Sequence, residues 1–379
     1  MKTKVVIEQF VIPHYRVPVF KELAKEVDLT LVTSTNKNVD GLHQVGGELP
    51  FKIVYLDERP ESGLFHPEIF DLIEENKADV LISLSSSLDL MLSNKSAIKK
   101  IKSLRLKTIW MGCDGYAVRH FLPNLFINLL NPKRTLRTIK EIVAKSKIDH
   151  FLPYSSHTSK YLQQRLFVPK NKITIAHNAI DTSILRQRFT QWQDSGSKRD
   201  PYKIIFTGRL TPRKNVDTLI KAFGNIRKIY PQATLEIVGE GSDTENLKHL
   251  AKNLGLEGRV IFTGAIYDDN ILANHLLSSS LFIMPSVGGL GFNSAMACAL
   301  PIIYTHADGT EEDMFTEGIN GWFFDGSVGD LTLKITSALK DPSKLLEMGL
   351  VSQKLVTEKF TVENMVRVYK ETIEKVLKI

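Results

Sequence analysis

The sequence predicts an α/β protein made of two Rossmann-like domains that face each other across a cleft. Segments with strand patterns alternate with helical patterns, and several strands are nearly continuous apolar runs, as expected for parallel strands covered on both faces. The alternation stops once, at a polar stretch near residue 190, and then restarts. A chain of 379 residues is long enough for two separate cores.

The expected strands fall into two groups, one for each doubly wound sheet. In the first group, helical patterns at 19–26, 67–76 and 158–166 separate strands at 4–10, 27–34, 51–56, 79–84, 107–111, 150–154 and 172–176. The second group has strands at 204–207, 234–238, 260–263, 281–284 and 302–304.

The domain boundaries follow from the segments between and after these groups. The polar stretch RQRFTQWQDSGSKR (186–199) has a Ser-Gly-Ser centre and is interpreted as an interdomain linker or a long surface loop. The closing segment 362–377 has the pattern of a long amphipathic helix. We therefore expect domains at 1–183 and 200–358, followed by a helical segment, 359–379, that packs back on the N-terminal domain.

Composition excludes several classes of protein. The hydrophobic share of 43% and the charged share of 24% are those of a globular protein, and no apolar run approaches the length of a membrane-spanning helix. The chain begins directly with a strand pattern, so we expect no signal peptide and a cytoplasmic location. Cys113 and Cys298 lie far apart, which favours two free thiols in a reducing compartment.

Positive charge is concentrated in one segment. The net charge is +7, and residues 93–147 hold thirteen Lys or Arg against two acidic residues. Within them, FLPNLFINLLNPKRTLRTIK (121–140) sets apolar side chains beside cations, which suits peripheral contact with an anionic inner leaflet. A core-facing helix with a solvated basic face explains the pattern equally well. Nucleic acid is not an expected partner, because neither an aromatic stacking platform nor a recognised binding motif accompanies the charge.

Two loops are candidates for binding an anion. The 26 residues from 281 to 306 contain no charged side chain, and their glycine-rich turn, 288–291, opens a small-residue helix with backbone N–H groups that suit a phosphate. TGRLTPRKN (207–215) supplies Arg209, which can hold a phosphate through two hydrogen bonds, and Lys214, a point charge. Alone, the second loop could be a solvated basic turn. Both loops follow strands of one predicted sheet, so they could converge on one pyrophosphate.

With these residues in place, the second domain resembles that of the family-four retaining glycosyltransferases, two-domain enzymes of the glycosyltransferase-B fold that use nucleotide sugars. The matching blocks cover nearly the whole C-terminal domain: TGRLTPRKNVDTLIKAF (207–223), EIVGEGSDTENL (236–247), VIFTGAI (260–266), MPSVGGLGFNSAMACALPII (284–303) and DGTEEDMFTEGINGWFF (308–324). The N-terminal domain is less distinctive. It resembles a bacterial subgroup that acts in surface-polysaccharide assembly, through IPHYRVPVFKELA (12–24), TIWMGCDG (108–115) and IAHNAIDT (175–182).

The resemblance implies that the C-terminal domain binds a nucleotide-diphosphate sugar and needs no other cofactor. It implies that Arg209 and Lys214 are catalytic, because cations on the donor pyrophosphate stabilise the charge that develops as the sugar leaves. The implied donor site consists of Gly208, Gly239, Gly241, Gly289, Leu290, Gly291, Phe292, Asn293 and Ser294. No metal is expected, because the sequence lacks the Asp-x-Asp motif associated with a metal-bridged pyrophosphate in the other main glycosyltransferase fold.

The N-terminal domain is expected to bind the acceptor, which would be lipid-linked or a growing glycan. His14, Tyr15 and Arg16 follow the first strand and should line the acceptor side of the cleft, with a surface turn as the alternative. Asp114 and His120 flank the end of the fifth strand, either as acceptor-side polar groups or as structural residues.

One position departs from the family pattern. The family usually has two glutamates eight positions apart, and the second accepts hydrogen bonds from the ribose hydroxyls. Ser294 stands at that second position, and glycines occupy the region of the first. A hydrogen bond to a charged group contributes roughly 1.5–3 kcal/mol, so the serine is expected to weaken donor binding by about tenfold to a hundredfold. Ser294 can also be a helix N-cap.

The predicted protein is therefore a cytoplasmic retaining glycosyltransferase that associates peripherally with the inner face of the membrane. Two alternatives stay open. One is a glycosyltransferase-like protein with weak or no activity, because of Ser294. The other is a sugar-nucleotide epimerase on the same fold.

Overall fold

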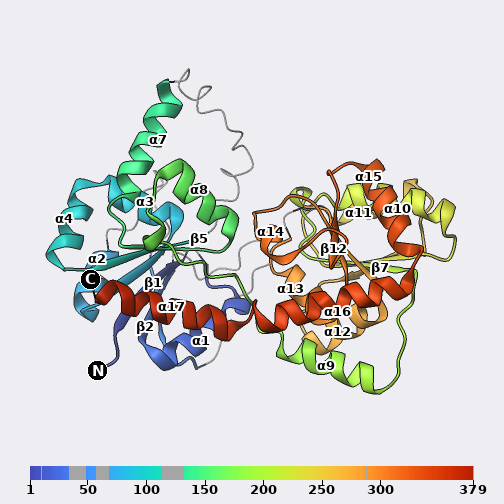
Figure 1. Cartoon of the computed structure of the whole chain (residues 1–379), viewed down its shortest axis with the longest axis horizontal. Helices are drawn as coiled ribbons and strands as arrows, with labels where there is room; N and C mark the ends of the chain where they lie inside the picture. Colours follow the sequence, from blue (N-terminus) through green and yellow to red (C-terminus); the bar gives the residue numbers. More distant parts are fainter. Residues whose placement is uncertain (10, 34–47, 57–67, 113–131, 287, 379) are drawn as a thin grey trace. The chain divides into compact units, whose positions relative to one another are not determined.

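The computed structural model describes residues 1–379 except 10, 34–47, 57–67, 113–131, 287 and 379 (Figure 1). The chain divides into two compact units: unit 1 consists of Met1–Asn178 and Val362–Ile379, and unit 2 of Ala179–Thr361. Each unit contains one six-stranded parallel sheet flanked by helices. Two Rossmann-like domains are thereby confirmed. Among the described residues, no helix is both long enough and apolar enough to cross a membrane.

The sheet of unit 1 has the strand order β3-β2-β1-β4-β5-β6. Its central neighbours, β1 and β4, are separated along the chain by β2 and β3, so a crossover lies between them. Most residues of β1, β2, β4, β5 and β6 are buried, which explains their apolar runs. The strands are β1 (Lys4–Gln9), β2 (Asp28–Thr33), β3 (Lys52–Tyr55), β4 (Val80–Leu84), β5 (Lys107–Gly112) and β6 (His150–Pro153).

Helices connect and cover these strands. The described helical segments of unit 1 are η1 (His14–Arg16), α1 (Val17–Glu26), α2 (Ile69–Asn76), α3 (Ser85–Ser93), α4 (Lys95–Ser103), α7 (Pro132–Lys145), α8 (Ser156–Leu166), η2 (Lys170–Lys172) and α17 (Val362–Leu377).

The last helix of the chain, α17, completes unit 1. It packs against α1, and its buried residues recur every three or four positions, on one face. Tyr369 is 1% exposed, and its Oη lies 2.9 Å from Sδ of Met111 on β5. The guanidinium of Arg16 donates a hydrogen bond to Sδ of Met365 at 3.4 Å. The two ends of the chain therefore share one core, although the whole of unit 2 separates them in the sequence.

The sheet of unit 2 has the order β12-β11-β10-β7-β8-β9, which repeats the topology of unit 1. Its strands are β7 (Lys203–Thr207), β8 (Thr234–Val238), β9 (Val260–Gly264), β10 (Leu281–Met284), β11 (Ile302–Tyr304) and β12 (Gly321–Phe323). Its helical segments are α9 (Ser183–Asp194), η3 (Pro212–Lys214), α10 (Val216–Ile229), α11 (Thr244–Asn253), α12 (Asp269–Ser278), α13 (Gly291–Ala297), α14 (Glu311–Met314), α15 (Val328–Leu339) and α16 (Pro342–Glu358).

Three segments differ from the sequence-based expectation. The stretch 186–199, expected to be a linker, forms most of α9, because Leu185 and Phe189 bury one face of that helix in the core of unit 2. The segment 172–176, expected to be a strand, makes a single bridge, from Ile173 to Phe151. The strand β12 was not expected, and of its three residues only Gly321 is fully buried, so the segment lacks the buried apolar run of the other short strand, β11.

The docking of α17 predicts how unit 1 responds to changes at Tyr369. Replacing a buried aromatic side chain by alanine typically costs about 3–5 kcal/mol, so Tyr369→Ala should lower the free energy of unfolding by that amount. Tyr369→Phe loses only the hydroxyl contacts and should cost about 1 kcal/mol. Denaturant unfolding checks both values, with the exposed Glu374→Ala on the same helix as a control. Equal effects of Tyr369→Ala and Glu374→Ala would show that α17 is not part of the core.

Candidate functional site

The strand order of unit 2 brings two loops to one point on the edge of the sheet. β7 and β10 are neighbours, with Leu281 paired to Ile204 and Phe282 to Ile205. The chain crosses from one face of the sheet to the other between these strands, and doubly wound sheets bind ligands in the crevice at such a point. The loop 208–215 follows β7, and the turn 288–291 follows β10. The structure therefore places both predicted loops where a ligand is expected.

Glycine is required at this edge because the loops pack backbone against backbone. A Cβ atom at Gly239 would lie 1.9 Å from the carbonyl oxygen of Gly208, and one at Gly241 would lie 2.1 Å from that of Leu210. The same loops are joined by a hydrogen bond from the backbone N–H of Leu210 to the backbone carbonyl oxygen of Glu240 at 2.8 Å. Side chains at these glycines would force the loop after β7 away from the loop after β8.

The uncharged turn after β10 packs against the ring of Phe292 at Gly288, whereas no described residue covers its backbone at Gly289. A Cβ atom at Gly288 would lie 2.1 Å from the ring of Phe292, which is fully buried. Gly289 has φ +53°, a backbone conformation that favours glycine, and a Cβ atom there would meet none of the described residues within 4 Å. At Gly291 a Cβ atom would lie 3.4 Å from the carbonyl oxygen of Thr207, at the end of β7. A ligand can therefore approach the backbone closely at Gly289.

Lys214 lies partly buried beside charges from two loops. Burial and, to a smaller extent, the charge of Arg209 together lower the pKa of its ammonium group from 10.5 to about 8, and the charge of Asp308 opposes the decrease. Asp308 follows β11 and accepts hydrogen bonds from Thr310 N at 3.2 Å and Oγ1 at 2.6 Å. Two cations and one carboxylate thus meet at the strand ends. A perturbed lysine in such a position favours an anionic ligand, whose negative charge would stabilise the ammonium form.

Ser294 lies within α13 and not at its start. The N-cap position belongs to Leu290, so the expectation that Ser294 caps the helix is wrong. Ser294 is 6% exposed, next to the almost fully buried Asn293. Among the described residues, Nδ2 of Asn293 and Oγ of the buried Ser286 have no hydrogen-bond partner. Because buried polar atoms are normally paired, these two atoms are candidates for contact with a ligand.

Glu311 shapes the loop that carries Asp308. Its carboxylate is buried and accepts hydrogen bonds from Ala307 N at 2.7 Å and Gly309 N at 2.9 Å. Burial raises its pKa, and these hydrogen bonds oppose the increase. Glu311 is the first residue of α14, and its carboxylate folds back over the preceding loop and holds Asp308 in place. Sequence reasoning missed this role, and also Ser286, because neither residue belongs to a charged or glycine-rich pattern.

The residues expected on the acceptor side are only partly brought together. His14 is exposed and Tyr15 is half-buried, with ring centroids 5.6 Å apart. Arg16 is buried, with its guanidinium 5.1 Å from the ring centroid of Tyr154, so it anchors α17 within unit 1 and does not line an open surface. Asp114 and His120 lie outside the described residues. A role for His14 and Tyr15 in acceptor binding stays a prediction.

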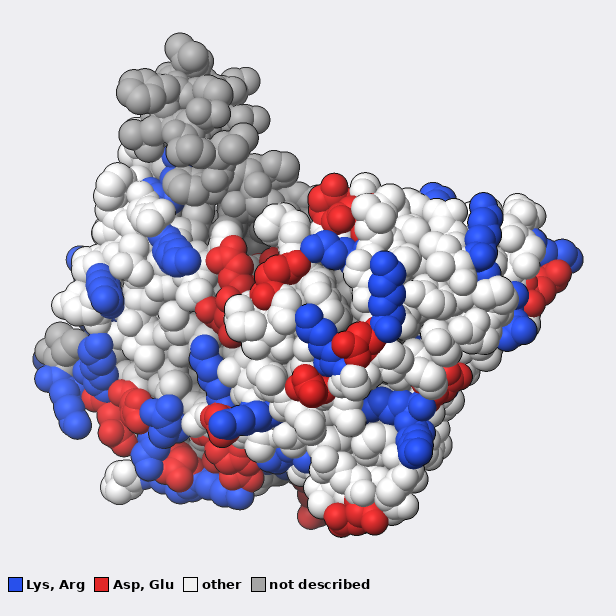
Figure 2. Space-filling view, turned by 45° about the vertical axis from the view of Figure 1, so that its right-hand side comes forward, with Lys and Arg blue, Asp and Glu red and all other residues white. Residues whose placement is uncertain are grey.

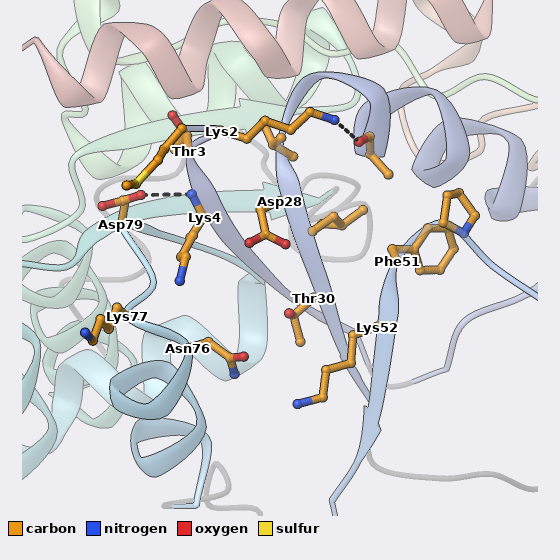
Figure 3. A pocket seen from close by; sticks show the side chains of 15 residues that line it. Lys2, Thr3, Lys4, Asp28, Thr30, Phe51, Lys52, Asn76, Lys77 and Asp79 are labelled. Atoms are coloured by element: carbon orange, nitrogen blue, oxygen red, sulfur yellow. Dashed lines mark hydrogen bonds between the residues drawn. The ribbon is translucent and has the colours of Figure 1, made fainter.

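A groove in unit 1 opens at the amino ends of its strands (Figure 3). Lys4 on β1 and Lys52 on β3, two strands separated by β2, line it together with Asp28 and Asp79. The backbone N–H of Lys4 donates a hydrogen bond to the Asp79 carboxylate at 2.8 Å. Cations and carboxylates alternate here, so the groove has no single sign of charge. It also lies at the edge opposite to that where doubly wound sheets bind ligands, and we do not assign the donor site to it.

Known proteins resemble both the sequence and the fold of this chain. Residues 187–353 match the family model of glycosyl transferases group 1, and this range lies wholly within unit 2. The C-terminal unit is a group 1 glycosyl transferase domain. The resemblance to family-four glycosyltransferases is thereby confirmed.

Two curated relatives are similar over part of the chain. A GDP-mannose-dependent alpha-(1-6)-phosphatidylinositol monomannoside mannosyltransferase of Mycolicibacterium smegmatis is 32% identical over 161 residues, 40% of this chain and 42% of the relative. An N-acetyl-alpha-D-glucosaminyl L-malate synthase of Bacillus anthracis is 32% identical over 226 residues, 58% of this chain and 57% of the relative. The matched region thus spans about two fifths to three fifths of these relatives.

Solved structures extend the similarity to the whole chain. The Anabaena protein Alr3699/HepE in complex with UDP has a TM-score of 0.72 at 15% identity, covering 98% of this chain and 100% of that one. Sucrose-phosphate synthase from Thermosynechococcus elongatus has a TM-score of 0.72 at 16% identity, with both chains fully covered. These likenesses show the fold, which is the glycosyltransferase-B fold.

The pKa of Lys214 predicts how anion binding to the group 1 domain depends on pH. With a pKa of about 8, Lys214 is charged at pH 7 and neutral well above pH 8, whereas a bound diphosphate favours the charged form. Affinity for a nucleoside diphosphate should therefore fall as pH rises from 8 to 10, by up to about tenfold per pH unit. Calorimetric titration across this range checks the slope. The variant Lys214→Arg keeps a positive charge throughout this pH range, so most of the pH dependence of the affinity should disappear. The same slope in both proteins would show that Lys214 is not the group that titrates.

Proposed function

We propose that this protein is a retaining glycosyltransferase that moves a sugar from a nucleotide-diphosphate donor to a lipid-linked or glycan acceptor in bacterial cell-surface glycan synthesis. The observation that carries the proposal is the electrostatic interaction of Lys214 with Arg209 and Asp308 at the strand ends of a group 1 domain, on the sheet edge from which the uncharged turn 288–291 also extends. The mycobacterial relative supports the donor and acceptor classes, because its name specifies GDP-mannose and a phosphatidylinositol mannoside.

The reaction needs positive charge where the leaving group forms. Breaking the bond between the sugar and the diphosphate leaves additional negative charge on the phosphate oxygens. A guanidinium such as Arg209 can hold a phosphate through two parallel hydrogen bonds, and Lys214 adds a point charge in a partly buried position. Because both cations are positioned before the reaction begins, they stabilise the transition state without reorganisation. Two fixed cations can perform the task of a metal ion, so we propose a metal-independent reaction.

Retention follows if the acceptor attacks from the face that the diphosphate leaves. The bond from the sugar C1 to the phosphate oxygen breaks, and the bond from C1 to the acceptor oxygen forms. A phosphate oxygen of the leaving group takes the proton of the acceptor hydroxyl. This route uses no protein nucleophile and differs from the two-carboxylate scheme of glycoside hydrolases. The open backbone at Gly289 leaves room for the sugar-phosphate to approach the turn.

Ser294 favours a second candidate, a glycosyltransferase-like protein that binds its nucleotide weakly and turns over slowly. The side chain is buried inside α13 and carries no charge, so it cannot replace the two hydrogen bonds that a carboxylate would accept from a ribose. The unpaired atoms of Asn293 and Ser286 nearby offer neutral hydrogen bonds to a ligand. The two candidates therefore share one donor site and differ in how strongly it binds.

Removing either cation should weaken the donor site. Arg209→Ala and Lys214→Ala should each reduce the affinity for the preferred nucleoside diphosphate by about tenfold to a hundredfold. Turnover should fall by about a hundredfold to a thousandfold. Calorimetric titration with UDP, GDP, ADP and their sugars measures the first effect. Lys228→Ala, which removes an exposed cation from α10, should change nothing. If wild type binds none of these nucleotides, the proposed function is wrong.

Restoring the family carboxylate separates the two candidate functions. Ser294→Glu should tighten nucleotide binding by about tenfold to a hundredfold if ribose hydroxyls lie beside this position. Ser294→Gln has nearly the same size and lacks the charge, so its effect should be much smaller. If wild type turns over near zero and Ser294→Glu gains turnover, the weakly active glycosyltransferase-like protein is supported. High turnover by wild type supports the active retaining glycosyltransferase. Weaker binding by a folded Ser294→Glu protein would show that no ribose lies there.

A further inference from the structure

Unit 2 contains a cavity at the edge of its sheet opposite to the candidate donor site. Ser280 and Pro301 line it and directly precede β10 and β11, so the cavity lies at the amino ends of these strands. Its volume is about 200 Å³, and most of the residues that line it are apolar. An apolar cavity of about 150 Å³ can bind benzene, so this one is large enough for a single small molecule.

Helices from distant parts of the sequence form the apolar wall of this cavity. α9 packs against α12 and α13, and α13 packs against α16 (Figure 1). Trp192 belongs to α9, and Leu345 and Leu346 belong to α16. Ala299, which lies just after α13, is close to α16, because a Cβ atom at Gly349 would lie 1.9 Å from the Ala299 carbonyl oxygen. The wall is thus built by close contact between helices of one unit.

A cation, Arg199, lines the same cavity. Its guanidinium donates hydrogen bonds to the backbone carbonyl oxygens of Ser279 at 2.7 Å, Cys298 at 2.6 Å and Leu276 at 3.5 Å. These carbonyls belong to the C-terminal ends of α12 and α13, where the helix dipole favours a cation. The guanidinium carbon also lies 5.1 Å from the ring centroid of Trp192. The charged group is therefore held in a fixed place beside the apolar wall.

No carboxylate balances the charge of Arg199. Other cations of unit 2 are paired, for example Lys221 with Asp217 and Lys334 with Glu317, each at 2.8 Å. On the surface in Figure 2, Lys and Arg side chains are likewise interspersed with Asp and Glu. In the described part of the chain, Arg199 forms no ion pair, and its hydrogen bonds go only to neutral carbonyls. An anion in the cavity would supply the missing charge.

Arg199 also keeps hydrogen-bond donors that the protein does not use. A guanidinium has five N–H groups, and the three carbonyls take at most three of them. The buried Nε atom has no hydrogen-bond partner within the described ranges, although buried polar atoms are normally paired. Burial lowers the pKa of the guanidinium from 12.5 to about 10, so the group remains charged at neutral pH. Carboxylates are the anions that a guanidinium binds through two parallel hydrogen bonds.

We propose that this cavity binds a small carboxylic acid with an apolar body. The carboxylate pairs with Arg199, and the apolar part contacts Trp192 and Leu345. Lys198, an exposed residue of the lining, adds a second positive charge. A space of about 200 Å³ accommodates one small molecule and not a segment of a protein chain. The site lies at the other edge of the sheet from the candidate donor site, so its ligand is distinct from a nucleotide sugar.

Matched small molecules test the ligand class without any nucleotide. The probe is phenylacetate, compared with phenylacetamide, which has the same size and no charge, and with acetate, which has the charge and no ring. Because hydrogen bonds to a charged group are stronger than neutral ones, wild type should bind phenylacetate at least about tenfold more tightly than either comparison compound. Calorimetric titration measures the three affinities.

Two substitutions in α16 test the location. Leu346 lines the cavity, whereas Leu350, one helical turn later, does not, and both are 39% exposed. Leu346→Glu adds a negative charge at the cavity that repels the ligand and competes for Arg199, so phenylacetate should bind at least about tenfold more weakly. Leu350→Glu makes the same change of charge outside the cavity and should bind like wild type. Thermal unfolding verifies that both variants are folded.

Removal of the cation tests the role of Arg199. Arg199→Gln should lose the preference for phenylacetate over phenylacetamide, and the Leu346→Glu result tests the site independently if this variant does not fold. The proposal is overturned if wild type binds neither phenylacetate nor 4-methylpentanoate, or if it binds the acid and the amide equally. Unchanged binding by Leu346→Glu also overturns it. None of these measurements involves a nucleotide, so their failure leaves the proposed function standing.

Discussion

The close packing of the loops that follow β7, β8 and β10 is the constraint on which the candidate site depends. A parallel sheet brings these strand ends to one edge, but that alone would leave the loops free to diverge. They stay together because glycines let one backbone touch the next, as at Gly239 against Gly208. Lys214 follows β7 on the same edge, where burial and the charge of Arg209 lower its pKa to about 8. An anionic ligand offsets that electrostatic cost, so the packing of the loops and the binding of a diphosphate are physically linked.

Unit 1 depends on a different kind of constraint, the placement of polar groups inside its core. Arg16 and Tyr369 join the first helix to the last, and Lys145 with Asp89 sets the rotation of α7. In both cases a buried polar side chain joins a helix to the core of unit 1.

The sequence located eleven of the twelve strands of the two sheets, because apolar runs and strand ends are local patterns, but it missed β12 and placed a strand at 172–176 that makes a single bridge. It located the loops with Arg209 and Lys214 and the turn near Gly289, and β7 and β10 prove to be neighbours. It was insufficient where burial depends on distant residues. In the sequence Arg16 has the pattern of an exposed cation, but in the fold the distant residues Tyr154 and Met365 contact its guanidinium. Likewise, the polar composition of 186–199 conceals a helix, because Leu185 and Phe189 are enough to anchor one face.

The central claim is that one diphosphate binds where β7 and β10 end. A crystal structure with the nucleoside diphosphate that binds most tightly tests it most directly. The account predicts phosphate oxygens within hydrogen-bond distance of Arg209 and Lys214, with the backbone of Gly289 facing the diphosphate. It would be contradicted by a diphosphate bound in unit 1, or by one that contacts neither cation.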